Sequence, residues 1–443
     1  MAGGTFIPGQ NKVRPGMYTR FISGGLNEPK LNNLGVMILP LQLKWGNAGD
    51  VIKVTNEGGL DALYQLGYDI THPTVLLVKE ALKEAATVLV YNLTGGTKAK
   101  AVLGSLTFTA TKAGERGNKL SITTKTNPLG GKDILLYLEG SKVFEATGVT
   151  DISTVKTPWF TVSGSGSIDE TAKTEFSTGT STVMNNSDVI NFLDNCELYN
   201  FKTMAFPFTE GELHTALLSK LKYFRDEVGK NIVAVTSDFA TCDYPYIINV
   251  KNGVVLEGGT KLTASQATAW VAGARAAAGY TEDLTYKAYT GAVDANPRLK
   301  HSQIVDGLKT GQFIFSTQTD SNSERVKVVV EEDINTHHTF TEEWDESFTD
   351  NKVVAVLDAV VDLGAQILVP NVFPNHKDGI KLAQDRLISL LTTLQAQGAL
   401  KNVDPDSDVV VDEEASKGKT MYATILTQPV RTFKKYFVTV KNN

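Results

Sequence analysis

The sequence predicts an α/β (α+β) multidomain protein with an inserted all-β domain and an extended β-strand arm at each terminus. Three observations support this fold class. Helix and strand patterns alternate over residues 36–93 and again from residue 186 onward. Between them, residues 95–182 are rich in Thr, Gly, Ser and Lys and show short strand patterns without a convincing helix. The third observation is a period-two strand pattern close to each end of the chain.

The N-terminal pattern covers residues 17–22, where successive side chains would face opposite sides of one strand. Pro8-Gly9 and Pro15-Gly16 precede it as turn signals, and each proline removes one backbone donor. A lone strand does not satisfy its own backbone, so it must pair with a strand of the same chain or of another. The candidate residues are Met17, Tyr18, Thr19, Arg20 and Phe21.

The next segments read as the start of an α/β layer interrupted by a β-rich insertion. Residues 36–45 are typical of a buried strand, and a short amphipathic helix ending at Ala86 leads to a second strand over 88–91. Turn signals such as Asn127-Pro128 separate the strands that follow. Those predicted strands of the insertion cover residues 106–111, 119–124, 133–138 and 158–164.

Helices and strands alternate again in the central part, where a strand over 232–238 and a helix of small residues over 265–279 stand out. In the last third an apolar helix follows Asp350. Asn375 is predicted to cap the next helix, which ends near Gly398. After an acidic loop over 404–414 come two strand patterns, and the second one carries Tyr436, Phe437, Val438, Thr439 and Val440.

Charge is distributed unevenly along the 443 residues, whose net charge is −6. Residues 1–33 carry four basic side chains and one acidic one, and residues 428–443 carry four basic and no acidic side chains. Basic ends on an acidic body predict ends that reach for acidic surfaces, which copies of the same protein offer. The sequence lacks a dense basic patch with interleaved aromatic residues, so we do not expect a nucleic-acid partner. The sequence has no run of about 18 apolar residues, so we expect no membrane insertion. Its N-terminus lacks the apolar core of a signal peptide, so we expect synthesis into the cytoplasm.

Motifs that carry chemistry are missing from the sequence. It contains no HxxxH, HExxH or CxxC spacing for zinc, no GxGxxG after a strand, no GxxxxGK[ST] and no GxSxG elbow. Cys196 and Cys242 lie in apolar surroundings and read as buried thiols, not as a disulfide framework. We therefore expect no catalytic residues, no cofactor, no metal site and no enzyme activity.

Four segments, in order along the chain, resemble the contractile tail sheath proteins of phages and phage-like particles (R-type bacteriocins and defective prophages) of Gram-positive bacteria. The opening GGTF…QNKVRPGMYTRF is similar to the N-terminus of that family. ATKAGERGNKLSIT resembles its Gly-x-x-Gly-Asn strand entry, and EEDINTHHTFTEEWDESFTDNKVVAVLDAV resembles its "INT…TF…LDA" block. The ending ILTQPVRTFKKYFVTV is similar to its "QPV…K-aromatic-x-TV" terminus.

The resemblance implies an α/β sheath core whose terminal arms each add a strand to a sheet of a neighbouring subunit. It implies homo-oligomeric hexameric rings stacked helically around an inner tail tube protein, with baseplate and tail terminator proteins as further partners. Contraction would drive the tube through a target cell envelope. The protein would assemble in the bacterial host cytoplasm and end in the tail of a virion or phage-like particle.

The same resemblance divides the chain and suggests a contact with the tube. The expected parts are the N-terminal arm (1–25), the first part of the sheath core (26–94), the inserted outer domain (95–182), the α/β sheath domain (183–345), the C-terminal α/β domain facing the tube (346–427) and the C-terminal arm (428–443). In related sheaths a charged helix of the C-terminal domain contacts the tube. The corresponding candidates here are Lys377, Asp378, Lys381, Asp385 and Arg386.

Other interpretations of the same patterns stay open at this point. The minority interpretation of each terminal strand is an edge strand inside its own chain. The charged helix face is equally compatible with a solvated surface. A surface-layer or capsid component would also self-assemble, but into flat sheets or shells. An α/β enzyme with an unfamiliar site would be a monomer or closed oligomer with a ligand-sized pocket.

Overall fold

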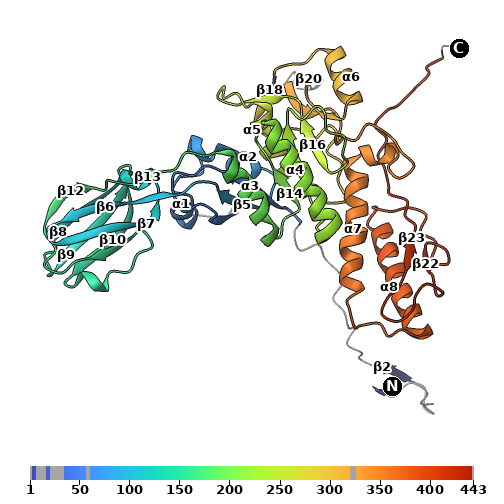
Figure 1. The fold of residues 1–443 in the computed structure, drawn as a ribbon, viewed down its shortest axis with the longest axis horizontal. Coiled ribbons are helices and arrows are strands. Elements are labelled where there is room, and N and C mark those ends of the chain that lie inside the picture. The colour runs from blue at the N-terminus through green and yellow to red at the C-terminus, as the bar shows by residue number, and fades with distance from the viewer. Residues whose placement is uncertain (1, 6–15, 20–33, 56–59, 320–325, 442–443) are drawn as a thin grey trace.

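A computed structural model describes residues 2–5, 16–19, 34–55, 60–319 and 326–441 of the chain. Figure 1 shows a β-sandwich at one end, a central α/β region, and two long helices with a small sheet at the other end. The helices and sheets confirm the predicted α/β (α+β) multidomain fold class.

The central region is built on a seven-stranded sheet with the strand order β19-β16-β15-β14-β3-β5-β4. Every neighbouring pair in it is parallel except the edge pair of β4 and β5, which is antiparallel. Parallel sheets need both faces covered, and their strands read as continuous apolar runs. The strands are β3 (Val36–Leu41), β4 (Val51–Thr55), β5 (Thr87–Asn92), β14 (Thr203–Ala205), β15 (Val233–Ser237), β16 (Ile247–Val250) and β19 (Gln312–Phe313).

Helices cover both faces of this sheet. Alternate residues of β3 enter different cores: Met37 packs with α2 (Leu76–Ala81) and α5 (Ala264–Ala278), whereas Ile38 packs with α3 (Asn186–Asn195) and α4 (Gly211–Tyr223). A Cβ on Gly273 of α5 would lie 2.5 Å from the Ala81 carbonyl oxygen, so the small residues of α5 permit its close contact with α2. The remaining elements of this region are α1 (Leu60–Leu66), α6 (His301–Lys309), β17 (Gly253–Leu256), β18 (Ala292–Asn296), β20 (Phe315–Thr319) and β21 (Val326–Val330).

The inserted segment forms a sandwich of two four-stranded antiparallel sheets, β10-β9-β8-β12 and β11-β7-β6-β13. Alternating apolar side chains from both sheets, among them Phe108 and Ile122, form its core. The strands are β6 (Gly96–Leu103), β7 (Leu106–Ala113), β8 (Leu120–Thr126), β9 (Lys132–Leu138), β10 (Ser141–Val149), β11 (Phe160–Ser163), β12 (Thr171–Glu175) and β13 (Thr180–Ser181).

A short segment between β7 and β8 fastens the sandwich to the central region. Gly114 has φ +119°, and a Cβ there would lie 2.1 Å from the carbonyl oxygen of Lys44. Two residues on, the buried Arg116 donates from Nε to the Gly67 carbonyl oxygen (2.8 Å) and lies over the Tyr68 ring (4.4 Å to its centroid). The Gly-x-x-Gly-Asn motif is therefore a domain joint in which a side chain at its first glycine would not fit.

The C-terminal part consists of α7 (Asn351–Ile367) and α8 (Lys377–Ala396) with the two-stranded sheet of β22 (Val409–Val411) and β23 (Ala423–Ile425). The predicted cap of α8 was wrong by one residue. His376 is the N-cap, and its Nδ1 accepts from the Gly379 N–H (3.3 Å). The Asn375 amide instead donates to the Gly418 carbonyl oxygen (2.7 Å), so it holds a loop.

Buried charges dock α7 on the central region. Asp358 pairs with Arg225 and lies 3.7 Å from the Lys202 ammonium, and all three side chains are less than a tenth exposed. The Arg225 guanidinium also lies over the Tyr246 ring, 3.3 Å from its centroid. One turn further along α7, Asp362 contacts Lys202 at 3.3 Å but is more exposed. The geometry of this contact depends on Asp358, since two buried cations face it.

We expect Asp358→Asn to lower the free energy of unfolding by about 3 kcal/mol, because Arg225 loses its buried carboxylate. Asp362→Asn is the matched control on the same helix, and we expect it to cost about 1 kcal/mol. Chemical denaturation of the two variants checks this. Equal losses would contradict the assignment of Asp358 as the main docking group.

At the sandwich joint, we expect Gly114→Ala to destabilise the protein by about 3 kcal/mol or more, because strained backbone and a steric clash with Lys44 combine. Gly130→Ala serves as control, since Gly130 also has a positive φ but has open space around its Cβ position, and about 1 kcal/mol is expected there. Thermal unfolding of both variants measures the difference, which vanishes if the clash does not matter.

Candidate functional site

The predicted N-terminal strand pairs within the described structure with the start of its own chain. β2 (Gly16–Thr19) runs parallel to β1 (Ala2–Thr5), with Met17 opposite Gly3. This two-stranded sheet includes no strand of the central region or of the C-terminal part. Two of the candidate residues, Arg20 and Phe21, lie outside the described residues.

The predicted C-terminal strand over residues 436–440 is not formed in the described chain. No backbone hydrogen bond of the described structure involves residues 435–441. A strand needs a neighbouring strand to bond with, and this segment has none among the described residues of its own chain, so its alternating pattern is left without a partner there. Large apolar side chains here are almost fully exposed: Phe433 84%, Tyr436 77%, Phe437 95%, Val438 81% and Val440 90%.

The residues before this segment, in contrast, are held against the body. The chain at 428–430 pairs with 399–401, through the Val430 N–H to the Ala399 carbonyl oxygen (2.8 Å) and the Lys401 N–H to the Gln428 carbonyl oxygen (3.0 Å). In Figure 1 the C-terminal chain then passes α7 and points away from the molecule. We call residues 428–434 the root and 435–441 the free segment of the C-terminal arm. Sequence reasoning treated the arm as one piece and missed this division.

The root ends in a set of ion pairs. Lys434 Nζ lies 3.2 Å from Asp350, 3.5 Å from Asp283 and 3.9 Å from Glu332, and its side chain is only 14% exposed. The Thr432 hydroxyl donates to Asp283 (2.6 Å). Lys434 is therefore held by carboxylates from three separate positions of the chain.

The pKa values of these groups are consistent with paired charges. Burial by itself would lower the pKa of Lys434, but the attraction of Asp350 and the other carboxylates outweighs it and raises the pKa above its ordinary value. Burial would raise the pKa of Asp283, but hydrogen bonds from Thr285 and Thr432 and the charge of Lys434 bring it below the usual range. Both groups are charged at neutral pH.

The small sheet of β22 and β23 presents an uncovered apolar face. α8 lies against β22, and Gln384 Nε2 donates to the Val409 carbonyl oxygen (2.6 Å). Val410 on the other face is 51% exposed, and Tyr422 and Leu426 beside it are 56% and 54% exposed. Sequence analysis read residues 404–414 as a loop, although three consecutive valines at 409–411 were a strand signal. A two-stranded sheet has two free edges and is marginal in water by itself.

The charged face predicted on α8 is present. The apolar stripe of this helix is buried: Leu387, Leu391 and Leu394 pack against α7, and Ala383 is buried on the same side. The five candidates lie on its other side, and within the described residues none of their side chains makes an ion pair. All five are exposed: Lys377, Asp378, Lys381, Asp385 and Arg386.

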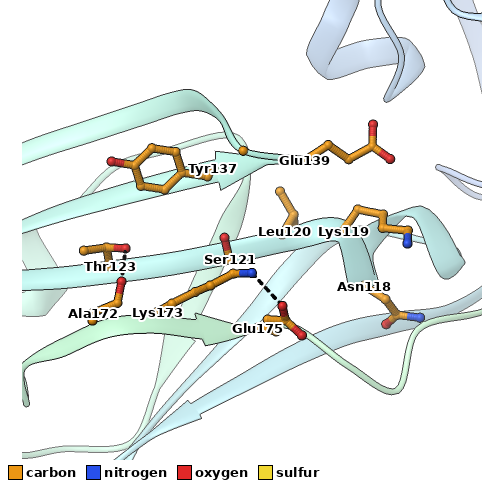
Figure 2. Close-up of a pocket in the computed structure, with 11 residues that line it drawn as sticks. Asn118, Lys119, Leu120, Ser121, Thr123, Tyr137, Glu139, Ala172, Lys173 and Glu175 are labelled. Atoms are coloured by element: carbon orange, nitrogen blue, oxygen red, sulfur yellow. Dashed lines mark hydrogen bonds and ion pairs between the residues drawn. The ribbon is translucent and has the colours of Figure 1, made fainter.

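A hollow of about 770 Å³ lies on the outer face of the sandwich, over β8, β9 and β12 (Figure 2). Its acidic side chains are already paired, Glu175 with Lys173 (2.7 Å) and Glu139 with Arg116 (2.6 Å). The Thr123 hydroxyl donates to the Ala172 carbonyl oxygen (2.8 Å). No hydrogen bond in this lining joins a hydroxyl nucleophile to a base, so the hollow has the chemistry of a polar surface groove.

Both cysteines and His337 are buried. Burial raises the pKa of Cys196 to about 12 and that of Cys242 to about 11, which keeps both thiols protonated. His337 bonds Asp243 (3.0 Å) and the Trp344 carbonyl oxygen (3.2 Å). Within the described part of the chain, no group of three or more His, Cys, Asp or Glu side chains is suited to a metal ion. No helix described there has the length and apolarity to span a bilayer.

Three domain models match consecutive parts of the chain. They describe the tail sheath protein Gp18 domain III N-terminal region (residues 35–93), the phage tail sheath protein central domain (182–336) and the phage tail sheath C-terminal domain (343–442). The sandwich lies between the first and second matches.

Whole-chain comparisons agree with these matches. The phage-like element PBSX protein XkdK of Bacillus subtilis is 33% identical over the full length of both chains. The crystal structure of a sheath tail protein from Desulfitobacterium hafniense is 35% identical, with a TM-score of 0.82 over 94% of this chain and 96% of that one. The contracted helical sheath of the anti-feeding prophage is 13% identical, with a TM-score of 0.57 over 98% and 99%, a likeness of fold alone.

Proposed function

The chain belongs to the phage tail sheath family, and we propose that its copies assemble as stacked hexameric rings around an inner tail tube and contract to drive that tube through a target cell envelope. It is a structural subunit of a sheath. The observation that carries the assembly proposal is the free segment of the C-terminal arm, which has a strand pattern, exposed apolar side chains and no backbone partner in the described chain.

The free segment is a strand donor. Seven residues with unsatisfied backbone groups gain hydrogen bonds when they join the edge of another sheet, and their alternating side chains set the register. Tyr436, Val438 and Val440 would face one side and Phe437 and Thr439 the other. We assign the same role to the N-terminal residues 17–21. Their described part lies in β2, which among the described elements pairs with β1 alone.

The sheet of β22 and β23 is the acceptor. The edge of β23 offers backbone groups, whereas the β22 edge is partly taken by Gln384, and the outer face offers the apolar side chains of Val410, Tyr422 and Leu426. Six carboxylates at 404–414 surround it, which complements the basic arms. Donor and acceptor are different surfaces of one chain, so each contact leaves both a donor and an acceptor open. Such heterologous contacts propagate into an open helical tube.

Contraction in this scheme releases free energy stored at assembly. Arms joined by backbone hydrogen bonds keep subunits connected while the bodies rotate and move outward. Each subunit needs to contribute only roughly a few kcal/mol, because a stack of rings sums many identical two-state elements.

We also propose an orientation for the subunit. We assign the charged face of α8 to the tube, because charged side chains without ion-pair partners among the described residues suit a polar contact that must slide. The sandwich then projects outward. Baseplate and tail terminator proteins would contact the first and last rings. Assembly would take place in the bacterial host cytoplasm, and the finished sheath would belong to a virion or phage-like particle.

Strand donation is tested by Val438→Pro, with Val438→Ala as its control. Proline removes one backbone donor and blocks pairing, whereas alanine keeps the donor and the register. We expect hollow tubes by negative-stain microscopy from the unaltered chain and from Val438→Ala, and none from Val438→Pro or from a chain lacking residues 1–22. The three full-length proteins should show the same melting temperature within about 2 °C, because the Val438 side chain is exposed. Discrete monomers instead of tubes from the unaltered chain would refute the proposed function.

The tube contact is tested by reversing two charges on α8, in Lys381→Glu/Arg386→Glu. Sheath assembly without tube should be unchanged, and co-sedimentation with the inner tube protein should fall at least about tenfold, since each reversed charge costs roughly 1 kcal/mol or more at a complementary interface. Lys100→Glu/Lys156→Glu changes the net charge equally on the sandwich and should bind tube normally. Loss of tube binding in both double variants would place the effect in overall charge.

A further inference from the structure

We propose that Lys434 is the positioning residue of the C-terminal arm: it locks the root into an acidic socket of Asp283, Glu332 and Asp350 and so sets the point from which the free segment leaves the subunit. The inference rests on the proposed function, in which that segment pairs with a neighbouring subunit.

The socket lies where the central region meets α7. Asp283 follows α5, Glu332 follows β21, and Asp350 is the N-cap of α7, where its other oxygen accepts from the Lys352 N–H (2.9 Å). The side chains of Asp283 and Asp350 are 7% and 4% exposed. Carboxylates buried to this extent need a partner cation. Lys434 contacts both of them and also Glu332.

A third buried acid, beside Asp283 and Asp350, makes the demand for a cation stronger. Asp333, next to Glu332, is fully buried and pairs with Arg275 (2.9 Å). Burial raises its pKa, so this site does not tolerate a further uncompensated negative charge nearby. Arg431 is a weaker candidate for the same task, because it lies 3.9 Å from Asp350 and its side chain is 48% exposed. Lys434 is thus the main cation that the arm supplies to the socket.

Lys434 is also the last anchor of the arm among the described residues. The backbone bonds to 399–401 end at Val430, and from Lys435 onward the described structure records no ion pair or hydrogen bond. With the lock closed, seven described residues extend beyond it and span at most about 25 Å. Opening the lock also removes the cation that draws the root to Asp283, so we expect the Thr432–Asp283 hydrogen bond to open with it. The tether would then begin at Val430, and the reach would rise to roughly 40 Å. The lock therefore confines the segment to one neighbouring site.

The inference predicts a measurable effect on assembly. A longer tether lowers the local concentration of the free segment at its acceptor by roughly twofold, by the −3/2 power of its length. We expect Lys434→Met to raise the critical concentration for tube formation at least about twofold. Lys434→Arg keeps the charge, so its critical concentration should equal that of the unaltered chain. Lys156→Met is the control for assembly, since it removes the same charge from an exposed position on the sandwich, outside the arm and its acceptor.

A spin label at Phe433→Cys reports on the root independently of assembly. Phe433 is 84% exposed and lies between the two anchored residues Thr432 and Lys434, while both native cysteines are buried. In unassembled protein we expect a slow, immobilised spectrum with Lys434 or Arg at the position, and a sharper, mobile spectrum with Lys434→Met. Lys435→Met should keep the immobilised spectrum. The same protein without the added cysteine gives the labelling background.

The outcomes separate the two proposals. A mobile label and a raised critical concentration in Lys434→Met, both reversed in Lys434→Arg, support the positioning role. An unchanged spectrum overturns it, and so does a mobile label with an unchanged critical concentration, while the proposed function stands in either case. If the unaltered chain forms no tubes at any concentration, the proposed function itself fails, and the positioning role falls with it.

Discussion

The buried carboxylate of Asp333 is the constraint on which the arrangement of the domains depends. It accepts from Arg275 of α5, from the Leu284 N–H (3.0 Å) and from the Asn351 amide at the start of α7 (2.8 Å). A fully buried carboxylate without these partners would cost several kcal/mol, so the three segments are held in one relative position. Lys434 joins the same junction, which connects the root of the arm to the packing of the whole subunit.

Around this rigid junction the subunit leaves specific groups unpartnered. The free segment has backbone donors and acceptors without a sheet, and the small sheet of β22 and β23 has free edges and an apolar outer face. Exposed edge strands of this kind would favour uncontrolled aggregation if the strands were long and flat. Here they are short, and basic arms and acidic surroundings restrict which surfaces meet. In the proposed assembly, a rigid body with strand-pairing arms suits a subunit that must move while it stays connected to its neighbours.

The block of residues 331–360 shows what pattern reasoning reached and where it stopped. Its resemblance to sheath proteins pointed to the family, which the comparisons show. The reason for its polar residues is visible only in the fold. Asn335 Nδ2 donates to the Phe348 carbonyl oxygen (2.7 Å), and the Thr336 hydroxyl donates to the Tyr244 carbonyl oxygen (2.8 Å). The α8 cap was assigned one residue early for a related reason, because Asn375 and His376 are both able to cap and a distant loop took Asn375.

The sequence alone determined the alternation of helix and strand, the β-rich insertion, the basic ends and the family. These are local or compositional properties, and residues close together in the chain suffice to express them. Tertiary structure decided which charges are buried and which strands find partners. Period-two alternation at 436–440 describes a side-chain pattern, but a strand exists only where another backbone supplies hydrogen bonds. The lock at Lys434 likewise arises from three carboxylates that the fold brings together from positions 283, 332 and 350.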